Sequence, residues 1–185
     1  VSYGGWVSVK YAAARPERVQ GLVLASAPGP GFAPDRRQQY YVRAPHLLLP
    51  AFLVTTRQRM KPELKRALPD AAARFRFVRR QLALMARAPI SPGMMARRLR
   101  VAMQEDFAAA ARSVRAPTLV VPGEDGLDRV VPVSSTREYL QLVPGATGAV
   151  LAHTGHLGCV TRPREFAALV RSVTCRTAEA AGVAG

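Results

Sequence analysis

The chain has 185 residues, 49% of them hydrophobic, with 27 Lys and Arg against 12 Asp and Glu and a formal net charge of +15. This composition is too apolar for a disordered polypeptide, and the length suits one domain with its own core. No apolar run approaches the roughly 18 residues that a transmembrane helix needs, so the sequence predicts a globular chain without a membrane span.

The first residues contain a candidate nucleophile. Ser2-Tyr3-Gly4 matches the second half of the motif G-x-S-x-G, in which a serine occupies a sharp turn between a strand and a helix. Helical periodicity follows from Trp6 to about Ala14. By itself the tripeptide says little, because S-x-G occurs by chance in most proteins, and Ser2 could instead be a helix-capping serine.

Three short apolar runs predict the buried strands of a parallel sheet. They cover residues 21–25, 118–122 and 149–152, and turn residues bound each of them. Because each run alternates with a helical pattern, the sequence predicts strand-helix-strand units and an α/β fold.

Two helices are predicted after the second strand. One fits residues 135–142, where Ser135 and Glu138 have the spacing of a capping box. The other begins near Pro163, because proline is favoured in the first turn of a helix. The Ala- and Gly-rich residues 178–185 are expected to form a flexible tail.

The segment of residues 30–115 contains no strand-like run and carries apolar residues at helical spacing. Prolines at positions 45, 50, 62, 69, 89 and 92 are expected to divide it into several short helices. The segment holds 18 of the 27 basic residues and five acidic ones. Because no nucleic-acid-binding motif or aromatic interleaving accompanies the arginines, we interpret them as a solvated helical surface and expect no nucleic-acid partner.

Two loops that follow predicted strands carry residues typical of active sites. Asp128 lies after the second strand, and Gly155-His156 lies after the third. In open α/β sheets, the loops at the carboxyl ends of the strands gather at one edge, where active sites form. The chain order serine, acid, histidine is that of one hydrolase architecture. Asp128 could instead pair with a nearby arginine, and His156 could be structural.

These motifs, in this order, resemble the α/β-hydrolase fold family, in particular its capped serine hydrolases. The resemblance runs from the turn at Ser2 to the loop at His156, and residues 30–115 match the family's helical cap in position and character. It implies a partial α/β-hydrolase fold with parallel strands, flanking helices and a helical cap insertion. It implies Ser2 as nucleophile, His156 as general base and Asp128 as the acid that orients the histidine. The Tyr3 N–H would supply half of an oxyanion hole.

The same resemblance divides the chain into four parts. Residues 1–29 supply the nucleophile turn, its helix and the first core strand, and residues 30–115 form the cap. Residues 116–177 complete the core with the acid and histidine loops, and residues 178–185 are the tail. The glycine that leads the motif would precede Val1, so we expect the chain to be the C-terminal part of a longer protein and to be inactive alone.

The choice of acid is open between two residues. The family usually places the acid three residues after the strand-end glycine, which is Gly126 here. The spacing Asp128-x-x-Val-Pro132 favours Asp128, and Asp125 is the alternative. Three other reactive side chains are interpreted as structural: His46, His153 and Cys159.

The resemblance implies a serine hydrolase that cleaves an ester-like or related carbonyl substrate through an acyl-enzyme intermediate. The apolar cap favours a hydrophobic small molecule, and the arginines would accept an anionic group on it. An acyltransferase or perhydrolase with the same three residues is one alternative, and a non-catalytic remnant whose basic cap binds a partner is another. No cofactor or metal is implied, since no metal cluster, phosphate loop or dinucleotide fingerprint occurs. The two cysteines favour a cytoplasmic location, and the oligomeric state is left open.

Overall fold

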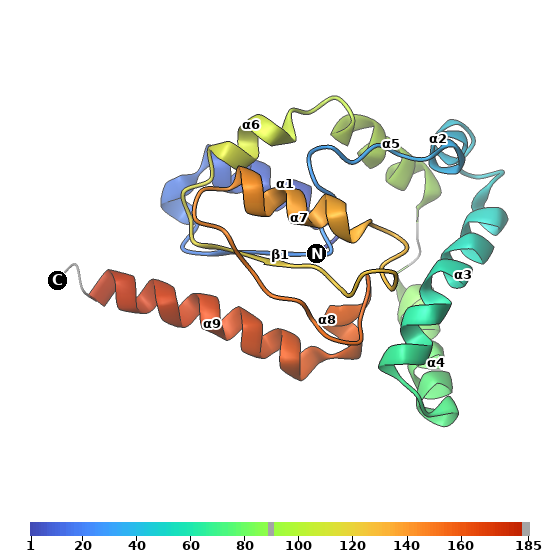
Figure 1. Ribbon diagram of the computed structural model, residues 1–185. Coiled ribbons are helices and arrows are strands. Elements are labelled where there is room, and N and C mark those ends of the chain that lie inside the picture. The colour runs from blue at the N-terminus through green and yellow to red at the C-terminus, as the bar shows by residue number, and fades with distance from the viewer. Residues whose placement is uncertain (89–90, 183–185) are drawn as a thin grey trace.

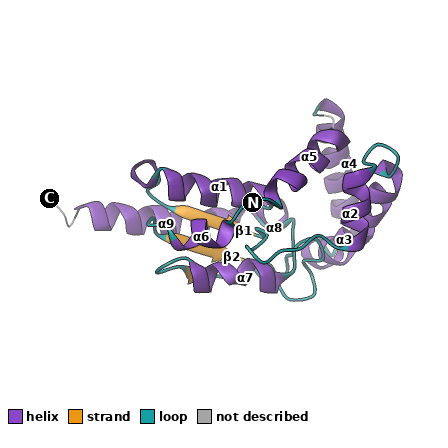
Figure 2. Ribbon diagram, turned by 90° about the horizontal axis from the view of Figure 1, so that it is seen from above, coloured by secondary structure: helices purple, strands orange, loops and turns teal. Residues whose placement is uncertain are grey.

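The computed structural model describes residues 1–88 and 91–182, and at its centre lies a parallel sheet of three strands in the order β1-β2-β3 (Figures 1 and 2). The strands are β1 (Leu22–Ala25), β2 (Thr118–Val121) and β3 (Thr147–Gly148). β1 and β2 coincide with two of the predicted strands and pair in parallel. The predicted α/β class is therefore confirmed.

The third predicted strand, residues 149–152, is wrong in its position. β3 lies just before it and consists of exposed residues. The contact with β2 nevertheless continues, because the Ala149 N–H donates to the Val120 carbonyl at 3.0 Å. Apolar character marks burial and not backbone pairing, so the run located the buried Leu151 and missed the strand.

Helices cover both faces of the sheet (Figure 1). One face packs against α1 (Tyr3–Ala14), α6 (Phe107–Arg112) and α7 (Val133–Leu142), and the other against α9 (Pro163–Gly182). The alternation of side chains along a strand produces these two cores. In β1, Leu24 joins the core under α1, whereas Val23 and Ala25 pack toward α9.

The helix predicted at residues 135–142 is present as α7, but its predicted capping box is wrong. α7 begins two residues earlier, so Ser135 and Glu138 lie inside it. Both side chains accept hydrogen bonds from the loop after β1. The Gly29 N–H donates to Ser135 Oγ at 2.9 Å, and the Gly31 N–H donates to Glu138 Oε2 at 2.7 Å. The three-residue spacing that suits a capping box also places two side chains on one face of a helix. Here both side chains accept hydrogen bonds from the loop after β1 and do not cap α7.

The described residues between β1 and β2 form helices, as predicted. They are α2 (Arg36–Arg43), α3 (Leu49–Ala67), α4 (Ala71–Arg87), α5 (Pro92–Ala102) and α6. Figures 1 and 2 both show α2 to α5 gathered beyond one end of the sheet. α6 instead belongs to the sheet-covering layer, because Ala110 and Ala111 join the buried cluster that contains Val9 of α1.

Pro62 does not divide the segment as predicted, because it lies inside α3. Proline removes one helical hydrogen bond. The next residue, Glu63, is buried and accepts a hydrogen bond from the Leu157 backbone, so a tertiary contact holds the second half of the helix. Pro92 begins α5, as expected for a proline in a first turn. Pro89 lies outside the described residues.

Helix α9 reaches Gly182, further than the sequence predicted, because alanine-rich segments favour helix. Residues 183–185 of the predicted tail lie outside the described residues. The remaining short elements are a 3-10 turn (Pro16–Arg18) and α8 (Gly158–Thr161). Across residues 1–88 and 91–182, no helix combines the length and the apolar character that crossing a bilayer requires.

Candidate active site

Ser2 occupies a strained turn at the carboxyl end of the sheet. Its backbone has φ 52° and ψ −137°, and α1 begins at the next residue. A positive φ is unfavourable for a serine and persists only where the surrounding structure fixes it, which happens often at functional sites. Here the Ser2 N–H donates to the carbonyl of Ala25, the last residue of β1, at 3.1 Å.

The residue that must be glycine beside this turn is Gly5. A Cβ on Gly5 would lie 2.4 Å from Ala27 Cβ, so α1 can approach the segment after β1 only without a side chain there. A Cβ built on Gly4 would meet open space, because no atom of the described residues beyond its own stretch of helix lies within 4 Å. The glycine that the close approach of α1 requires is therefore Gly5, which lies one position after Gly4, the glycine of the Ser2-Tyr3-Gly4 motif.

Asp128 is held by its own loop. Its side chain is 1% exposed, and its Oδ1 accepts hydrogen bonds from the N–H groups of Val130 at 3.0 Å and Val131 at 2.9 Å. These two bonds fix the carboxylate and leave Oδ2 facing His156. The loop therefore orients the Asp128 carboxylate independently of its contact with His156.

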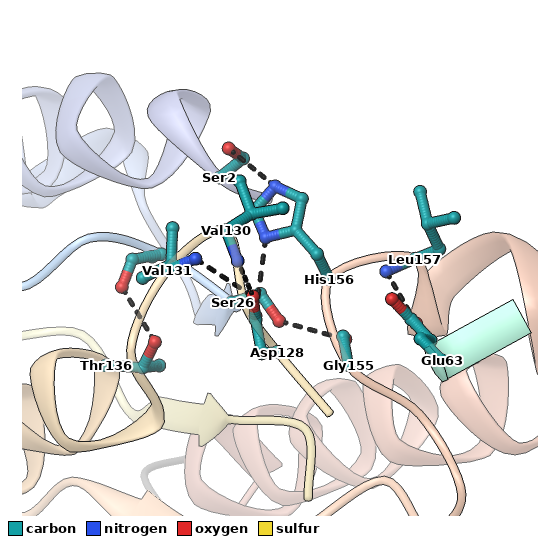
Figure 3. A network of polar contacts seen from close by, with 11 residues as sticks. Ser2, Ser26, Glu63, Asp128, Val130, Val131, Thr136, Gly155, His156 and Leu157 are labelled. Carbon is teal, nitrogen blue, oxygen red and sulfur yellow. Dashed lines mark hydrogen bonds and ion pairs between the residues drawn. The ribbon is translucent and has the colours of Figure 1, made fainter. Parts of the chain in front are cut away.

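The His156 ring lies between Ser2 and Asp128 (Figure 3). Its Nδ1 is 3.3 Å from Asp128 Oδ2, and its Nε2 is 3.0 Å from Ser2 Oγ. The ring is 10% exposed. The three residues proposed from the sequence are therefore brought together, each from a loop or turn at the carboxyl edge of the sheet.

Two glycines allow the acid and histidine loops to touch. A Cβ on Gly155 would lie 2.6 Å from the carbonyl carbon of Leu127, the residue before Asp128. A Cβ on Gly123 would lie 2.6 Å from both Gly155 Cα and the Thr154 carbonyl oxygen. Backbone therefore packs directly on backbone here, which only glycine permits.

Asp125, the alternative acid, points elsewhere. Its side chain is 69% exposed and forms an ion pair with Arg137 at 3.1 Å. Arg129, the arginine next to Asp128 in the chain, donates to the Gly126 carbonyl. The geometry therefore favours Asp128 over Asp125.

Tyr3, the expected oxyanion donor, is the first residue of α1. No preceding helical turn offers an acceptor to its N–H, as for every first residue of a helix. The Tyr3 ring packs edge-on against Trp6, with centroids 6.0 Å apart. The Tyr3 backbone N–H therefore lies in the same turn as the Ser2 hydroxyl, directly after the candidate nucleophile in the chain.

A cavity of about 810 Å³ opens onto both Ser2 and His156. Its walls are largely apolar and come from the core and from helices α2, α3 and α5, including Trp6, Phe32, Tyr41, Phe52, Met60 and Leu99. Trp6 Nε1 and the Tyr41 hydroxyl are buried and lack a hydrogen-bond partner within the described part of the chain. Burial raises the pKa of the Tyr41 hydroxyl.

Three arginines also line this cavity: Arg37, Arg59 and Arg98. Arg59 forms an ion pair with Asp35 at 2.7 Å. Arg37 and Arg98 have no ion-pair partner among residues 1–88 and 91–175. The cavity therefore combines apolar walls with two exposed arginines for which the described residues supply no ion-pair partner.

Glu63 is a buried acid near the site that the sequence did not reveal. Glu63 lies on α3 and is 1% exposed. Its Oε1 accepts a hydrogen bond from the Leu157 N–H at 2.8 Å. Burial raises the pKa of Glu63, while the backbone N–H groups of Gly155 and Leu157 oppose that rise. Because the contact joins residues 94 positions apart, no local pattern distinguishes Glu63 from an exposed helical glutamate.

Among the described residues, none of the other reactive side chains forms a hydrogen bond with the Ser2 hydroxyl. His153 is exposed and pairs with Glu124, and His46 lies against Gly93 at the start of α5. Burial raises the pKa of the Cys159 thiol, which disfavours the thiolate. In the part of the chain that the structure describes, no group of three or more His, Cys, Asp or Glu residues has an arrangement that would hold a metal ion.

A model of the alpha/beta hydrolase family matches residues 1–169 of the chain. The chain belongs to the α/β-hydrolase family. Two curated relatives match shorter segments of this chain. A 2-hydroxy-6-oxo-6-(2'-aminophenyl)hexa-2,4-dienoic acid hydrolase of Metapseudomonas resinovorans is 38% identical over 68 residues, which are 37% of this chain and 23% of the relative. A pyrrolizixenacetamide deacetylase of Xenorhabdus hominickii is 37% identical over 78 residues, which are 42% of this chain and 28% of the relative.

Solved structures resemble this chain over nearly its whole length. BpoC from Mycobacterium tuberculosis H37Rv has a TM-score of 0.72 at 25% identity, and the alignment covers 96% of this chain and 65% of BpoC. The enol-lactonase from Burkholderia xenovorans LB400 has a TM-score of 0.66 at 19% identity, with 95% of this chain and 64% of the lactonase covered. The chain thus spans slightly less than two thirds of each of these structures, which share its fold.

Proposed function

We propose that the protein is a serine hydrolase in which Ser2 is the nucleophile, His156 the general base and Asp128 the orienting acid. The position of the His156 ring carries this proposal. Its two nitrogens face Ser2 Oγ at 3.0 Å and Asp128 Oδ2 at 3.3 Å, beside a cavity large enough for a small molecule.

The acid determines which nitrogen of the histidine can act as the base. An ionised carboxylate only accepts hydrogen bonds, so the ring proton belongs on Nδ1, facing Asp128. Nε2 then carries the lone pair and accepts the hydrogen bond of the Ser2 hydroxyl. Because Oδ1 of Asp128 is already held by two backbone N–H groups, the carboxylate can keep the ring in this tautomer and orientation.

The reaction follows from this arrangement. Ser2 Oγ attacks the substrate carbonyl carbon while Nε2 of His156 takes the hydroxyl proton, and the Tyr3 N–H donates to the oxyanion. The leaving group departs with that proton, and an acyl ester on Ser2 remains. His156 then removes a proton from water, whose oxygen attacks the acyl carbon, and Ser2 regains its proton as the acid product leaves.

The cavity indicates the class of substrate. Its apolar and aromatic walls suit a hydrophobic acyl or leaving group, and Arg37 and Arg98 suit a carboxylate on that group. The names of the curated relatives, a dienoic acid hydrolase and a deacetylase, provide precedents for an acidic substrate and for removal of an acyl group. We therefore propose an aryl or alkyl carbonyl compound that bears an anionic group.

Labelling with a fluorophosphonate probe tests the proposal, using the full product of the gene that encodes this chain. The protein should react with the probe and hydrolyse a short-chain aryl ester, and Ser2→Ala should abolish both activities. Ser8→Ala is a matched control, because Ser8 lies on α1 and its hydroxyl donates to the Gly4 carbonyl of the same helix at 2.8 Å. Probe labelling that survives in Ser2→Ala would remove Ser2 from the mechanism. Product analysis with added alcohol or peroxide separates hydrolysis from acyl transfer.

A further inference from the structure

Glu63 is the buried carboxylate of the cap that reaches the histidine loop (Figure 3). It comes from α3, 1% of its surface is exposed, and within the described residues it has no ion-pair partner. A buried carboxylate without a counter-ion is costly unless hydrogen bonds compensate it. The Leu157 N–H, at 2.8 Å from Oε1, supplies such a bond.

The peptide groups on both sides of His156 are held by side chains from different parts of the molecule. On the core side, the hydroxyl of the buried Ser26, just after β1, donates to the Gly155 carbonyl at 3.3 Å. On the cap side, Glu63 accepts from the Leu157 N–H. His156 is the single residue between these two anchored positions, so its ring orientation depends on both.

We propose that Glu63 is a positioning residue, which fixes the His156 loop from the cap and makes the contact of His156 with Ser2 depend on docking of α3. The inference rests on the proposed function, in which His156 is the general base. Glu63 does not itself line the cavity, and its side chain accepts from the Leu157 N–H, so we infer that it acts through the loop and not on the substrate. The cap thereby has a second role besides shaping the cavity.

The expected effect is a loss of turnover with little change in substrate binding. Displacements of about 1 Å in a reacting group cost on the order of 100-fold in rate. Glu63→Ala should lower kcat by about 10- to 100-fold and change KM less than about threefold. Hydrogen exchange at the amides of residues 155–158 should accelerate at least about tenfold, because the Leu157 N–H loses its acceptor.

Two conservative variants separate an acceptor contact from a general effect of charge or packing. Glu63→Gln removes the charge but keeps an acceptor oxygen at the same reach, so kcat should stay within about fivefold of wild type. Glu63→Asp keeps the charge but withdraws the oxygen by one methylene, so kcat and amide protection should both fall. These two variants carry the test if Glu63→Ala fails to fold. The reverse order, with Asp active and Gln impaired, would overturn the proposal.

Glu105→Ala is the matched control, because Glu105 is an exposed acid that links the region after α5 to Lys10 of α1. It should leave kcat and the exchange at residues 155–158 unchanged. A Glu63→Ala protein with wild-type kcat, or with reduced kcat and unchanged loop exchange, would also overturn the proposal. If Ser2→Ala retained activity, the proposed function would fail, whereas hydrogen exchange would still report whether Glu63 holds the loop.

Discussion

His156 Nε2 lies 3.0 Å from Ser2 Oγ, although 154 positions separate the two residues. The contact exists because the turn before α1 and the loop that follows β3 lie at the same end of a parallel sheet. The Ser2 backbone is bonded to the end of β1, and the His156 loop packs backbone to backbone on the acid loop. The geometry of the site therefore depends on how closely these loops approach one another.

Replacing each candidate acid by its amide distinguishes Asp128 from Asp125. Asp128→Asn leaves an amide beside Nδ1 of His156 that can favour the wrong tautomer, so kcat should fall by about 10³- to 10⁴-fold. Asp125→Asn removes only an exposed ion pair with Arg137 and should leave kcat within about twofold. Steady-state hydrolysis of an aryl ester measures both variants. Equal losses in the two variants would contradict the assignment of Asp128.

The sequence predicted those parts of the fold and site that depend on local patterns and on sheet topology. The strands at residues 21–25 and 118–122 were found because buried parallel strands are continuous apolar runs. The meeting of Ser2, Asp128 and His156 was predicted because loops at the carboxyl ends of parallel strands converge.

The sequence failed where one local pattern serves two structures or where a contact spans the chain. The spacing of Ser135 and Glu138 fits a capping box and also fits docking of the loop after β1, which is what the structure contains. Pro62 predicted a break, but Glu63 and its contact 94 positions away hold α3 together. Tertiary contacts of this kind have no signature in a single sequence.

The neighbouring glycines of α1 should respond differently to alanine. Gly5→Ala forces a Cβ to within 2.4 Å of Ala27 Cβ, so it should lower the free energy of unfolding by about 1–3 kcal/mol. Gly4→Ala places its Cβ in open space in a helix and should maintain or raise stability. Urea denaturation followed by circular dichroism gives both values. If Gly4→Ala were less stable than Gly5→Ala, the conclusion that Gly5 and not Gly4 is crowded by Ala27 would be wrong.

The two cysteines should differ in reaction with iodoacetamide. Burial raises the pKa of the Cys159 thiol, so at pH 8 less of it is thiolate than its ordinary pKa would give, and the reactive fraction grows as pH rises. Cys175 is exposed. Peptide mapping after brief treatment at pH 8 should find modification at Cys175 and little at Cys159, with esterase activity retained. Rapid modification of Cys159 at that pH would contradict the raised pKa of its thiol.

The unpaired arginines of the cavity should select substrates that carry a carboxylate. Arg98→Gln and Arg37→Gln each remove a charge that faces the cavity without a partner among the described residues, whereas Arg59 is already paired with Asp35. A hydrogen bond to a charged group contributes about 1.5–3 kcal/mol, so KM for a carboxylate-bearing aryl ester should rise roughly tenfold or more in at least one variant. KM for the matched neutral ester should change less than about twofold.

The comparison between two esters separates charge recognition from damage to the cavity. Arg87→Gln, an exposed arginine at the end of α4, removes the same charge outside the cavity and should affect neither substrate. Added salt should raise KM for the carboxylate ester in wild type more than in the sensitive variant, because screening weakens an interaction that the variant has lost. Equal increases in KM for both esters would mean that the arginines shape the cavity and do not bind the anion.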